Sequence, residues 1–191
     1  MNNSFEEIIE VIENSNKIAV AGHISPDGDA VASCCSMAMA LIKKGKNAVV
    51  YLEEVPEKFK SVPYSDKVLT EEPEEDFDLF ISLDCGDMER LGKYSSIAEK
   101  TMVLNIDHHI SNTYFGNLNF VDGDASSTCE VVYRLIDGWC PLDKNIAQAL
   151  YTGIIFDTGC FKHSSTSPYT MKIAGELMTY NIPFTYVQEE I

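Results

Sequence analysis

Acidic and imidazole side chains lie at the ends of four separate segments of the sequence. The segments are residues 18–21, 78–84, 102–107 and 143–155; the first three are apolar runs typical of buried strands. The side chains concerned are His23, Asp27, Asp29, Asp84, Asp107, His108, His109 and Asp157. Because the carboxyl ends of parallel strands meet at one edge of a sheet, these side chains can converge. Mixed carboxylates and imidazoles bind divalent cations, so the pattern predicts a metal-centred site.

The turn after residues 18–21 joins a strand to a helix and carries three of these side chains. Pro26 fixes its own φ, and Gly28 adopts backbone angles that other residues avoid. Asp27 and Asp29 can therefore point into one cavity. Taken alone, the turn has another interpretation, in which Asp29 only caps the following helix and His23 is a buried, hydrogen-bonded histidine. The four segments together favour the metal site.

Charge repulsion also favours a bound metal. The five aspartates of the set would carry about −5 if they meet, and two carboxylates about 4 Å apart repel by roughly 4 kcal/mol at an effective dielectric constant of about 20. Two divalent cations would leave the cluster near −1. The ligand types suit Mn²⁺, with Mg²⁺ and Fe²⁺ as alternatives, and two such ions are typical of phosphoester hydrolysis.

Composition limits the class of protein. The chain has 191 residues, of which 45% are hydrophobic, enough for one globular domain with a sizeable core. A net charge of −16 argues against electrostatic binding of long nucleic acid, which needs Lys and Arg to displace counterions. No apolar run reaches membrane-spanning length, and the first residues lack the features of a signal peptide. We therefore expect a cytoplasmic protein with no membrane partner.

Six cysteines are scattered along the chain without a C-x-x-C pair. They are Cys34, Cys35, Cys85, Cys129, Cys140 and Cys160. Neither a zinc cluster nor a disulfide framework is indicated, so we expect reduced cysteines that act as small core residues.

Strands alternate with helices along the chain. Apolar runs predict strands at 18–21, 48–52, 78–84 and 102–107, and helical spacing predicts helices at 5–13, 29–44, 128–136, 143–155 and 168–178. The connector at 53–75 is expected to hold surface loop and short helix. This alternation predicts an α/β fold with a mostly parallel sheet and helices on both faces.

Four motifs occur in order between residues 23 and 159. They are His23-x-x-Pro26-Asp27-Gly28-Asp29-Ala30, Leu83-Asp84-Cys85-Gly86-Asp87-x-x-Arg90-x-Gly92, Asp107-His108-His109 and Gly153-Ile154-Ile155-Phe156-Asp157-Thr158-Gly159. Together they resemble the motifs of the DHH phosphoesterases. The stretches 112–116 and 125–130 are also similar to the subgroup that degrades very short RNAs and dephosphorylates 3′-phosphoadenosine 5′-phosphate (pAp).

The resemblance implies two metal ions, with Mn²⁺ as the expected cofactor. It implies that one ion is held by His23, Asp27 and Asp84, and the second by Asp29, Asp84, His108 and Asp157. Asp84 would then bridge the two ions.

The resemblance also implies three catalytic residues outside the ligand set. Asp107 would orient a histidine, and His109 would face the substrate phosphate. The alternative for His109 is a buried histidine bonded to backbone. Arg90 would either offer a bidentate fork to phosphate or pair on the surface with Glu89 or Asp87.

The resemblance implies a phosphohydrolase acting on short oligoribonucleotides, pAp or both. Inorganic pyrophosphatase, polyphosphatase and cyclic-dinucleotide phosphodiesterase are the alternatives within the enzyme class, and a nucleotide-binding regulatory module is the non-enzyme alternative. Residues 1–185 would form the DHH catalytic domain, and residues 186–191 would begin a linker to a DHH-associated C-terminal domain that is missing from this chain. The expected partners are a nucleotide substrate and that domain, and a homodimer is left open.

Overall fold

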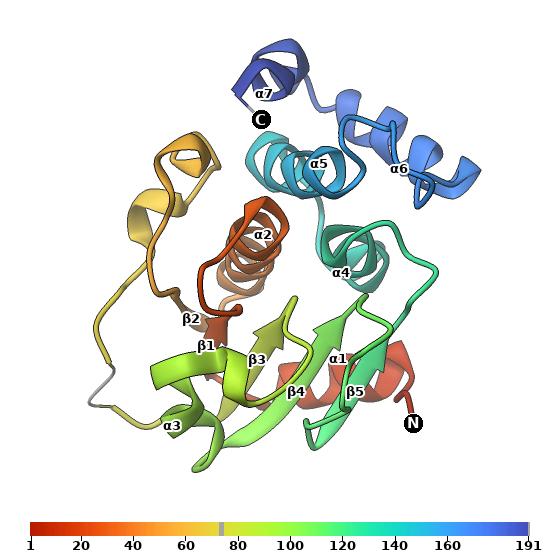
Figure 1. The fold of residues 1–191 in the computed structure, drawn as a ribbon. Coiled ribbons are helices and arrows are strands. Elements are labelled where there is room, and N and C mark those ends of the chain that lie inside the picture. Colours follow the sequence, from red (N-terminus) through yellow and green to blue (C-terminus); the bar gives the residue numbers. More distant parts are fainter. Residues whose placement is uncertain (73–74, 191) are drawn as a thin grey trace.

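A five-stranded sheet forms the centre of the computed structural model, which describes residues 1–72 and 75–190 (Figure 1). All neighbouring strands pair in parallel, in the order β2-β1-β3-β4-β5. The strands are β1 (Lys17–Ala21), β2 (Asn47–Tyr51), β3 (Leu79–Leu83), β4 (Met102–Asp107) and β5 (Leu118–Val121). The predicted α/β fold is confirmed, and the sheet is parallel throughout the described residues.

The central strands are apolar because both of their faces are covered. All five residues of β3 are buried, and so are four of the five in β1. Along β1, Ile18 and Val20 enter one core while Ala19 and Ala21 enter the other. Continuous apolar runs of this kind are typical of strands in a parallel sheet.

Seven helices and three short 3₁₀ segments are assigned in the described residues. They are α1 (Phe5–Asn14), α2 (Gly28–Lys43), α3 (Ser95–Ala98), α4 (Thr128–Ile136), α5 (Lys144–Asp157), α6 (Pro168–Met178), α7 (Phe184–Glu190), η1 (Glu57–Phe59), η2 (Ser65–Lys67) and η3 (Glu89–Tyr94). The expected connector thus holds η1 and η2, although residues 73 and 74 lie outside the described residues. Ile191, the last residue of the expected linker, lies outside them as well.

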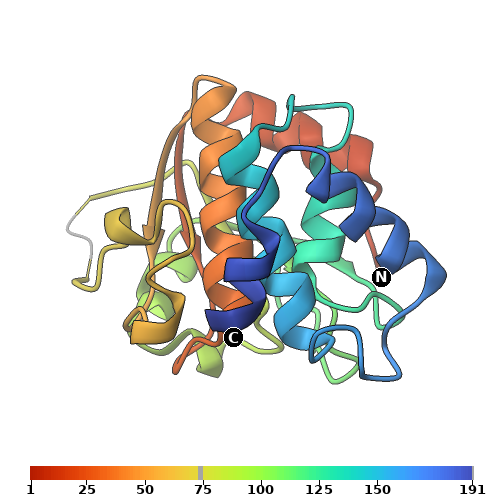
Figure 2. The same ribbon diagram turned by 90° about the horizontal axis from the view of Figure 1, so that it is seen from above.

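The two faces of the sheet are covered unequally. Helices α2 and α4 pack on one face, α5 lies over both of them, and α6 and α7 are outermost (Figures 1 and 2). Helix α1 joins the same core through Ile8 and Ile12. The other face is covered by η3 and α3, which bury Leu91, Tyr94 and Ile97. Helices on both faces are therefore confirmed, although η3 and α3 were not predicted.

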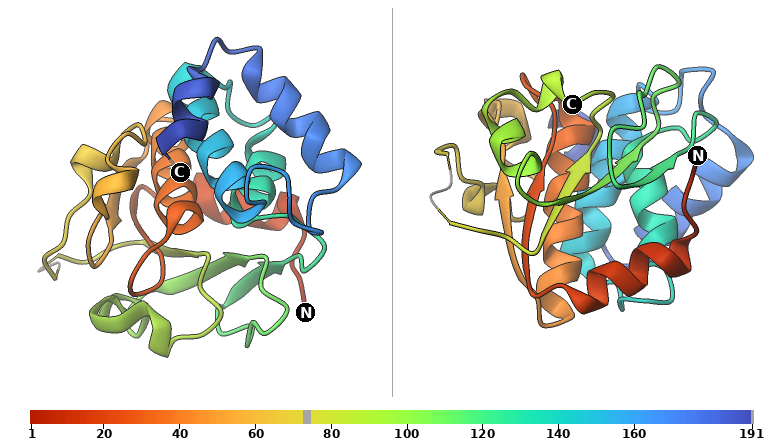
Figure 3. Two further views of the ribbon diagram at one scale, coloured as in Figure 1. Left: turned by 45° about the horizontal axis from the view of Figure 1, so that its top comes forward. Right: turned by 90° about the horizontal axis from the view of Figure 1, so that it is seen from below.

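Strand β5 is a further element that the sequence analysis did not predict. It forms one end of the sheet, and its residues alternate between half-buried and buried. The first residues of the chain run beside it, with the Asn3 backbone N–H donating to the carbonyl of Asn119 at 2.8 Å (Figure 3). Asn2 Oδ1 accepts from the Val121 N–H at 2.9 Å. These contacts cover backbone groups that an edge strand would otherwise expose.

Helix α2 begins at the turn that carries the first motif. Asp27 Oδ1 accepts from the backbone N–H groups of Asp29 and Ala30 at 3.0 and 3.1 Å, so Asp27 is the N-cap. The helix starts one residue before the predicted Asp29, and Asp29 does not cap it. Nearly all of α2 is buried because it lies between the sheet and α5, which explains its low charge.

The strand order makes the connections diverge between β1 and β3. The chain leaves β1 through α2 to reach β2 on one side, and leaves β3 through η3 and α3 to reach β4 on the other. In open parallel sheets, ligands bind outside the carboxyl ends of the strands where the connections diverge in this way. The carboxyl ends of β1, β3 and β4, three adjacent strands, are therefore where a site is expected. Among the described residues, no helix has both the length and the apolarity needed to cross a membrane.

Candidate metal centre

The first group of candidate ligands joins the ends of β1 and β3. His23 Nε2 lies 3.5 Å from Asp84 Oδ2 and 3.9 Å from Asp27 Oδ1, and the three residues can place one ligand atom each within 4.8 Å of one another. His23 Nδ1 lies 2.7 Å from the carbonyl oxygen of Ile24. When Nδ1 donates to that carbonyl, Nε2 of the neutral ring is left as the ligand atom.

The second group joins α2, the end of β4 and the end of α5. It consists of Asp29, His108 and Asp157. His108 Nε2 lies 3.1 Å from Asp157 Oδ2, and the Asp29 carboxylate is fully buried. Helix α5 approaches closely because Gly153, one turn before Asp157, has no side chain to separate α5 from Asp29.

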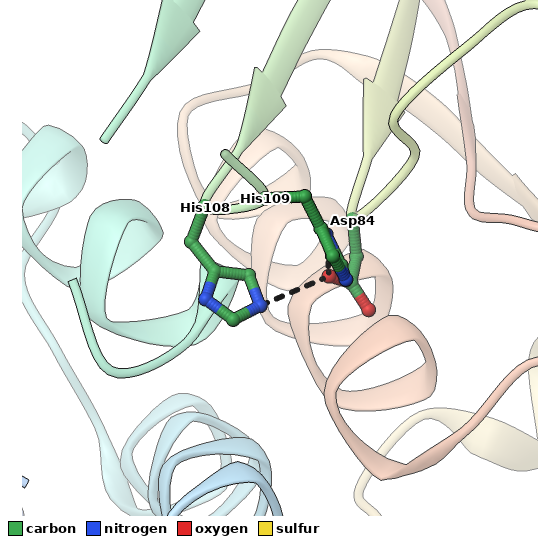
Figure 4. Close-up of side chains that lie close together, drawn as sticks. All are labelled: Asp84, His108 and His109. Carbon is green, nitrogen blue, oxygen red and sulfur yellow. Dashed lines mark ion pairs between the residues drawn. The ribbon is translucent and has the colours of Figure 1, made fainter. Parts of the chain in front are cut away.

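Asp84 links the two groups. Its Oδ1 lies 3.7 Å from His108 Nε2 (Figure 4). Its Oδ2 lies 3.5 Å from His23 Nε2. Asp84 is only 2% exposed, so its charge is shielded from bulk water. The structure thus brings together all six metal ligands proposed from the sequence, with Asp84 between the two histidines.

His108 provides a test of whether a metal ion fits this cluster. Its Nδ1 lies 3.4 Å from the carbonyl oxygen of Ala125, but its Nε2 is buried and has no hydrogen-bond partner in the described part of the chain. A buried polar atom without a partner is costly unless an ion or water satisfies it. Because carboxylate oxygens surround this nitrogen, the donor set fits a divalent cation.

Burial and crowding shift the pKa values of the cluster. Burial raises the pKa of both Asp27 and Asp29, and the nearby Asp84 carboxylate raises them further. Burial acts to lower the pKa of His108, but the Asp157 carboxylate, 3.1 Å from its Nε2, and the other carboxylates nearby outweigh burial and raise this pKa to about 10. Without metal, the cluster therefore holds protons that a cation must displace.

The stabilisation of the protein by Mn²⁺ is expected to increase with pH. The folded-state pKa of His108 lies above its ordinary value of 6.5, so its contribution to metal-free stability is complete below pH 6.5 and is lost as the pH rises toward about 10. Mn²⁺ needs the deprotonated ligands, so the Mn²⁺-induced rise in Tm should grow between about pH 6 and about pH 8.5. Thermal melts with and without Mn²⁺ measure this.

Glu10→Gln serves as a control for the melts, since Glu10 is exposed on α1 and lies outside the ligand groups. This variant should keep the pH dependence of the wild type. A Tm shift that is equal at all pH values in the wild type contradicts the proposed ligand set.

Asp107 and His109 form a pair beside the ligands. Asp107 is fully buried, and its Oδ1 lies 2.8 Å from His109 Nδ1. Asn112 Nδ2 donates to Asp107 Oδ2 at 2.7 Å. The hydrogen bond to Asp107 raises the pKa of His109 despite its burial. The His109 side chain is 40% exposed, so its ring is open to an approaching anion.

The structure does not bring the Arg90 guanidinium into the cluster by any hydrogen bond or ion pair within the described residues. Arg90 is exposed, and its backbone N–H donates to Asp87 Oδ1 at 2.9 Å. Its carbonyl accepts from the Ile24 N–H at 2.7 Å, which places η3 beside the first motif. No ion pair of Arg90 with Glu89 or Asp87 is present among the described side chains either.

Sequence reasoning missed the part played by Thr128. This residue contacts two of the candidate ligands, Asp29 and Asp84. It lies in the stretch 125–130, for which the sequence indicated only a resemblance to the subgroup that acts on very short RNAs and pAp. The spacing of Thr128 from either aspartate gives no signal of a contact.

Fold and site together define a parallel α/β domain with a candidate metal centre at the carboxyl ends of its strands. Residues 17–154 match the model of the DHH family, N-terminal domain. The chain belongs to this family.

Two curated relatives are about one third identical to this chain over the aligned residues. One is the bifunctional oligoribonuclease and PAP phosphatase NrnA of Thermus thermophilus, 31% identical over 193 residues and 97% of this chain. The other is the protein of the same name from Bacillus subtilis, 34% identical over 188 residues and 94% of this chain. The chain spans 56% and 57% of the length of these two relatives.

Solved structures show the same fold. An exopolyphosphatase-related protein from Bacteroides fragilis superposes with a TM-score of 0.90 at 26% identity, covering 97% of this chain and 59% of that protein. A putative family II inorganic pyrophosphatase from Methanococcus jannaschii superposes with a TM-score of 0.70 at 21% identity, covering 91% of this chain and 60% of that one. The second likeness concerns the fold alone.

Proposed function

We propose that this chain is the catalytic domain of a dinuclear-metal phosphohydrolase that acts on short oligoribonucleotides, on pAp or on both. The observation that carries the proposal is the position of Asp84, whose two oxygens face His23 and His108 in two neighbouring ligand groups. A shared carboxylate can bridge two adjacent cations, and a cation pair can acidify water and stabilise charge on phosphoryl oxygens.

The proposed cofactor is a pair of Mn²⁺ ions, with Mg²⁺ and Fe²⁺ as alternatives. The first ion would take His23, Asp27 and Asp84 as ligands. The second would take Asp29, Asp84, His108 and Asp157. Oxygen and imidazole donors without thiolate suit these metals.

The proposed catalytic residues outside the ligand sets are His109, Asp107 and Arg90. The Asp107 carboxylate fixes the His109 ring through Nδ1, so His109 is oriented toward the phosphate of the substrate. Arg90 is proposed as a phosphate contact because it is exposed on η3, next to the first motif.

The substrate proposal is supported by the relatives. Two proteins at 31% and 34% identity are named as bifunctional oligoribonuclease and PAP phosphatase. The fold is also shared with a putative inorganic pyrophosphatase and, at 26% identity, with an exopolyphosphatase-related protein. Pyrophosphatase, polyphosphatase and cyclic-dinucleotide phosphodiesterase therefore stand as the competing activities.

A substrate panel separates these activities. With Mn²⁺, the full-length gene product is expected to hydrolyse pAp and a diribonucleotide, and to leave pyrophosphate, polyphosphate and a cyclic dinucleotide largely intact. Release of mononucleotide and of inorganic phosphate is measured by chromatography. Fast cleavage of pyrophosphate alone overturns the proposed substrate class, and nucleotide binding without turnover of any substrate favours a regulatory module.

We propose residues 1–185 as the catalytic domain and a DHH-associated C-terminal domain as its partner within the same protein. The greater length of the relatives supports this division. Such a domain can supply positive charge near the substrate, which a chain of net charge −16 lacks. A cytoplasmic location and a homodimer stay predictions.

A further inference from the structure

Thr128, the first residue of α4, contacts candidate ligands from two separate parts of the chain. Its Oγ1 donates to Asp84 Oδ1 at 3.0 Å, and its backbone N–H donates to Asp29 Oδ2 at 2.6 Å. The residue is fully buried. The carboxylate at the end of β3 and the carboxylate in the first turn of α2 are thus held by one residue.

The start of α4 is itself fixed by side-chain hydrogen bonds. Ser127 is the N-cap, and its Oγ accepts from the Glu130 N–H at 3.1 Å. The backbone N–H of Cys129, the residue after Thr128, donates to Asp29 Oδ1 at 3.0 Å. Both oxygens of Asp29 therefore accept hydrogen bonds from free N–H groups in the first turn of α4.

The backbone of Asp84 adopts a conformation that most residues disfavour. Its φ of +54° lies in the left-handed region, which disfavours residues with a side chain, although Asp tolerates it better than most. Within the described residues, the Thr128 hydroxyl donates one hydrogen bond, and it goes to Asp84. This bond restricts the carboxylate that faces both His23 and His108.

We propose that Thr128 is a positioning residue that holds Asp29 and Asp84 in one fixed arrangement and so sets the geometry of both metal ions. The inference rests on the proposed function, since it assumes that these carboxylates bind metal. It adds a residue that touches neither metal nor substrate and acts through two ligands. Groups in this position keep a ligand in its binding orientation, and their loss weakens metal binding.

The test compares Thr128→Val with Thr128→Ser by calorimetric titration of Mn²⁺ into the 191-residue chain. Valine keeps the shape of threonine but removes the hydroxyl, whereas serine keeps it. We expect Thr128→Val to lose about 10–100-fold in Mn²⁺ affinity and Thr128→Ser to stay close to the wild type. Thr152→Val is the matched control, since Thr152 is buried in α5 and donates to the carbonyl of Gln148 at 2.8 Å. It should keep wild-type affinity.

Several results would overturn the proposal. They are wild-type affinity in Thr128→Val, equal losses in Thr128→Val and Thr128→Ser, and an equal loss in Thr152→Val. Thr128→Ala, which also lacks the hydroxyl, replaces valine if that variant does not fold. The titration needs no turnover, so a wild type that binds Mn²⁺ but hydrolyses no phosphoester contradicts the proposed function and leaves this test valid.

Discussion

Replacement of Asp84 by asparagine is expected to lower Mn²⁺-dependent hydrolysis roughly 10³-fold. Its carboxylate lies 3.5 Å from His23 Nε2 and 3.7 Å from His108 Nε2, so its loss weakens both proposed metal sites at once. Metal polarisation of a phosphoryl oxygen contributes several kcal/mol. A loss of about 4 kcal/mol corresponds to a roughly 10³-fold fall in kcat/KM. Steady-state kinetics of the full-length gene product with pAp or a diribonucleotide measures this fall.

Asp78→Asn is the matched control for Asp84→Asn. Asp78 immediately precedes β3, at the opposite end of the strand, where its Oδ2 accepts from the backbone N–H groups of Asn16 and Lys17 at 3.0 and 2.8 Å. Asp78→Asn should lower Tm slightly and leave the Mn²⁺ requirement unchanged. Mn²⁺-dependent turnover close to the wild-type rate in a folded Asp84→Asn variant rules out the shared-ligand role.

The local sequence pattern was sufficient to predict the central strands. Residues 18–21 are apolar throughout, and residues 79–83 and 102–107 are mostly apolar, because both faces of these strands are covered. Strand β5 escaped prediction because it has four residues, two of them half-buried, and is flanked by polar residues. Its existence depends on pairing with β4, a contact that local composition does not encode.

The 3₁₀ segment η3 and helix α3 contain regularly spaced apolar residues, although neither element was predicted. Leu91, Tyr94 and Ile97 recur every third residue and are buried against the outer face of the sheet. Gly92, with a φ of +57° and a non-helical ψ, interrupts the segment, so no continuous helical pattern extends through it. Spacing of apolar residues alone can therefore identify short covering segments.

The candidate ligands could be predicted because each lies at or beside the end of a recognisable segment. In a parallel sheet, this position fixes which edge a side chain reaches, whatever its distance along the chain. Thr128 could not be predicted in this way, because its contacts with Asp29 and Asp84 depend on where α4 begins in space. Residues that hold ligands are found from hydrogen bonds, which only the folded chain displays.

Gly153→Ala is expected to weaken both the fold and the binding of Mn²⁺. A Cβ at this position would overlap Cys129 Sγ and lie 2.6 Å from Asp29 Oδ1. Helix α5 would have to move away from α4 and from a proposed ligand. Overpacking of this kind costs about 1–3 kcal/mol of folding free energy. Chemical denaturation measures the stability, and calorimetric titration measures the Mn²⁺ affinity, which should fall as well.

Gly175→Ala is the matched control, because a Cβ on this exposed glycine of α6 meets nothing within 4 Å. Alanine there should stabilise the protein by up to about 1 kcal/mol, since alanine favours helix more than glycine does. Combining Gly153→Ala with Cys129→Ala removes the overlapping sulfur and should recover part of the lost stability, while the Mn²⁺ affinity stays low because Asp29 is still crowded. If Gly153→Ala stabilises the protein as Gly175→Ala does, close approach of α5 to Asp29 is not what requires glycine at this position.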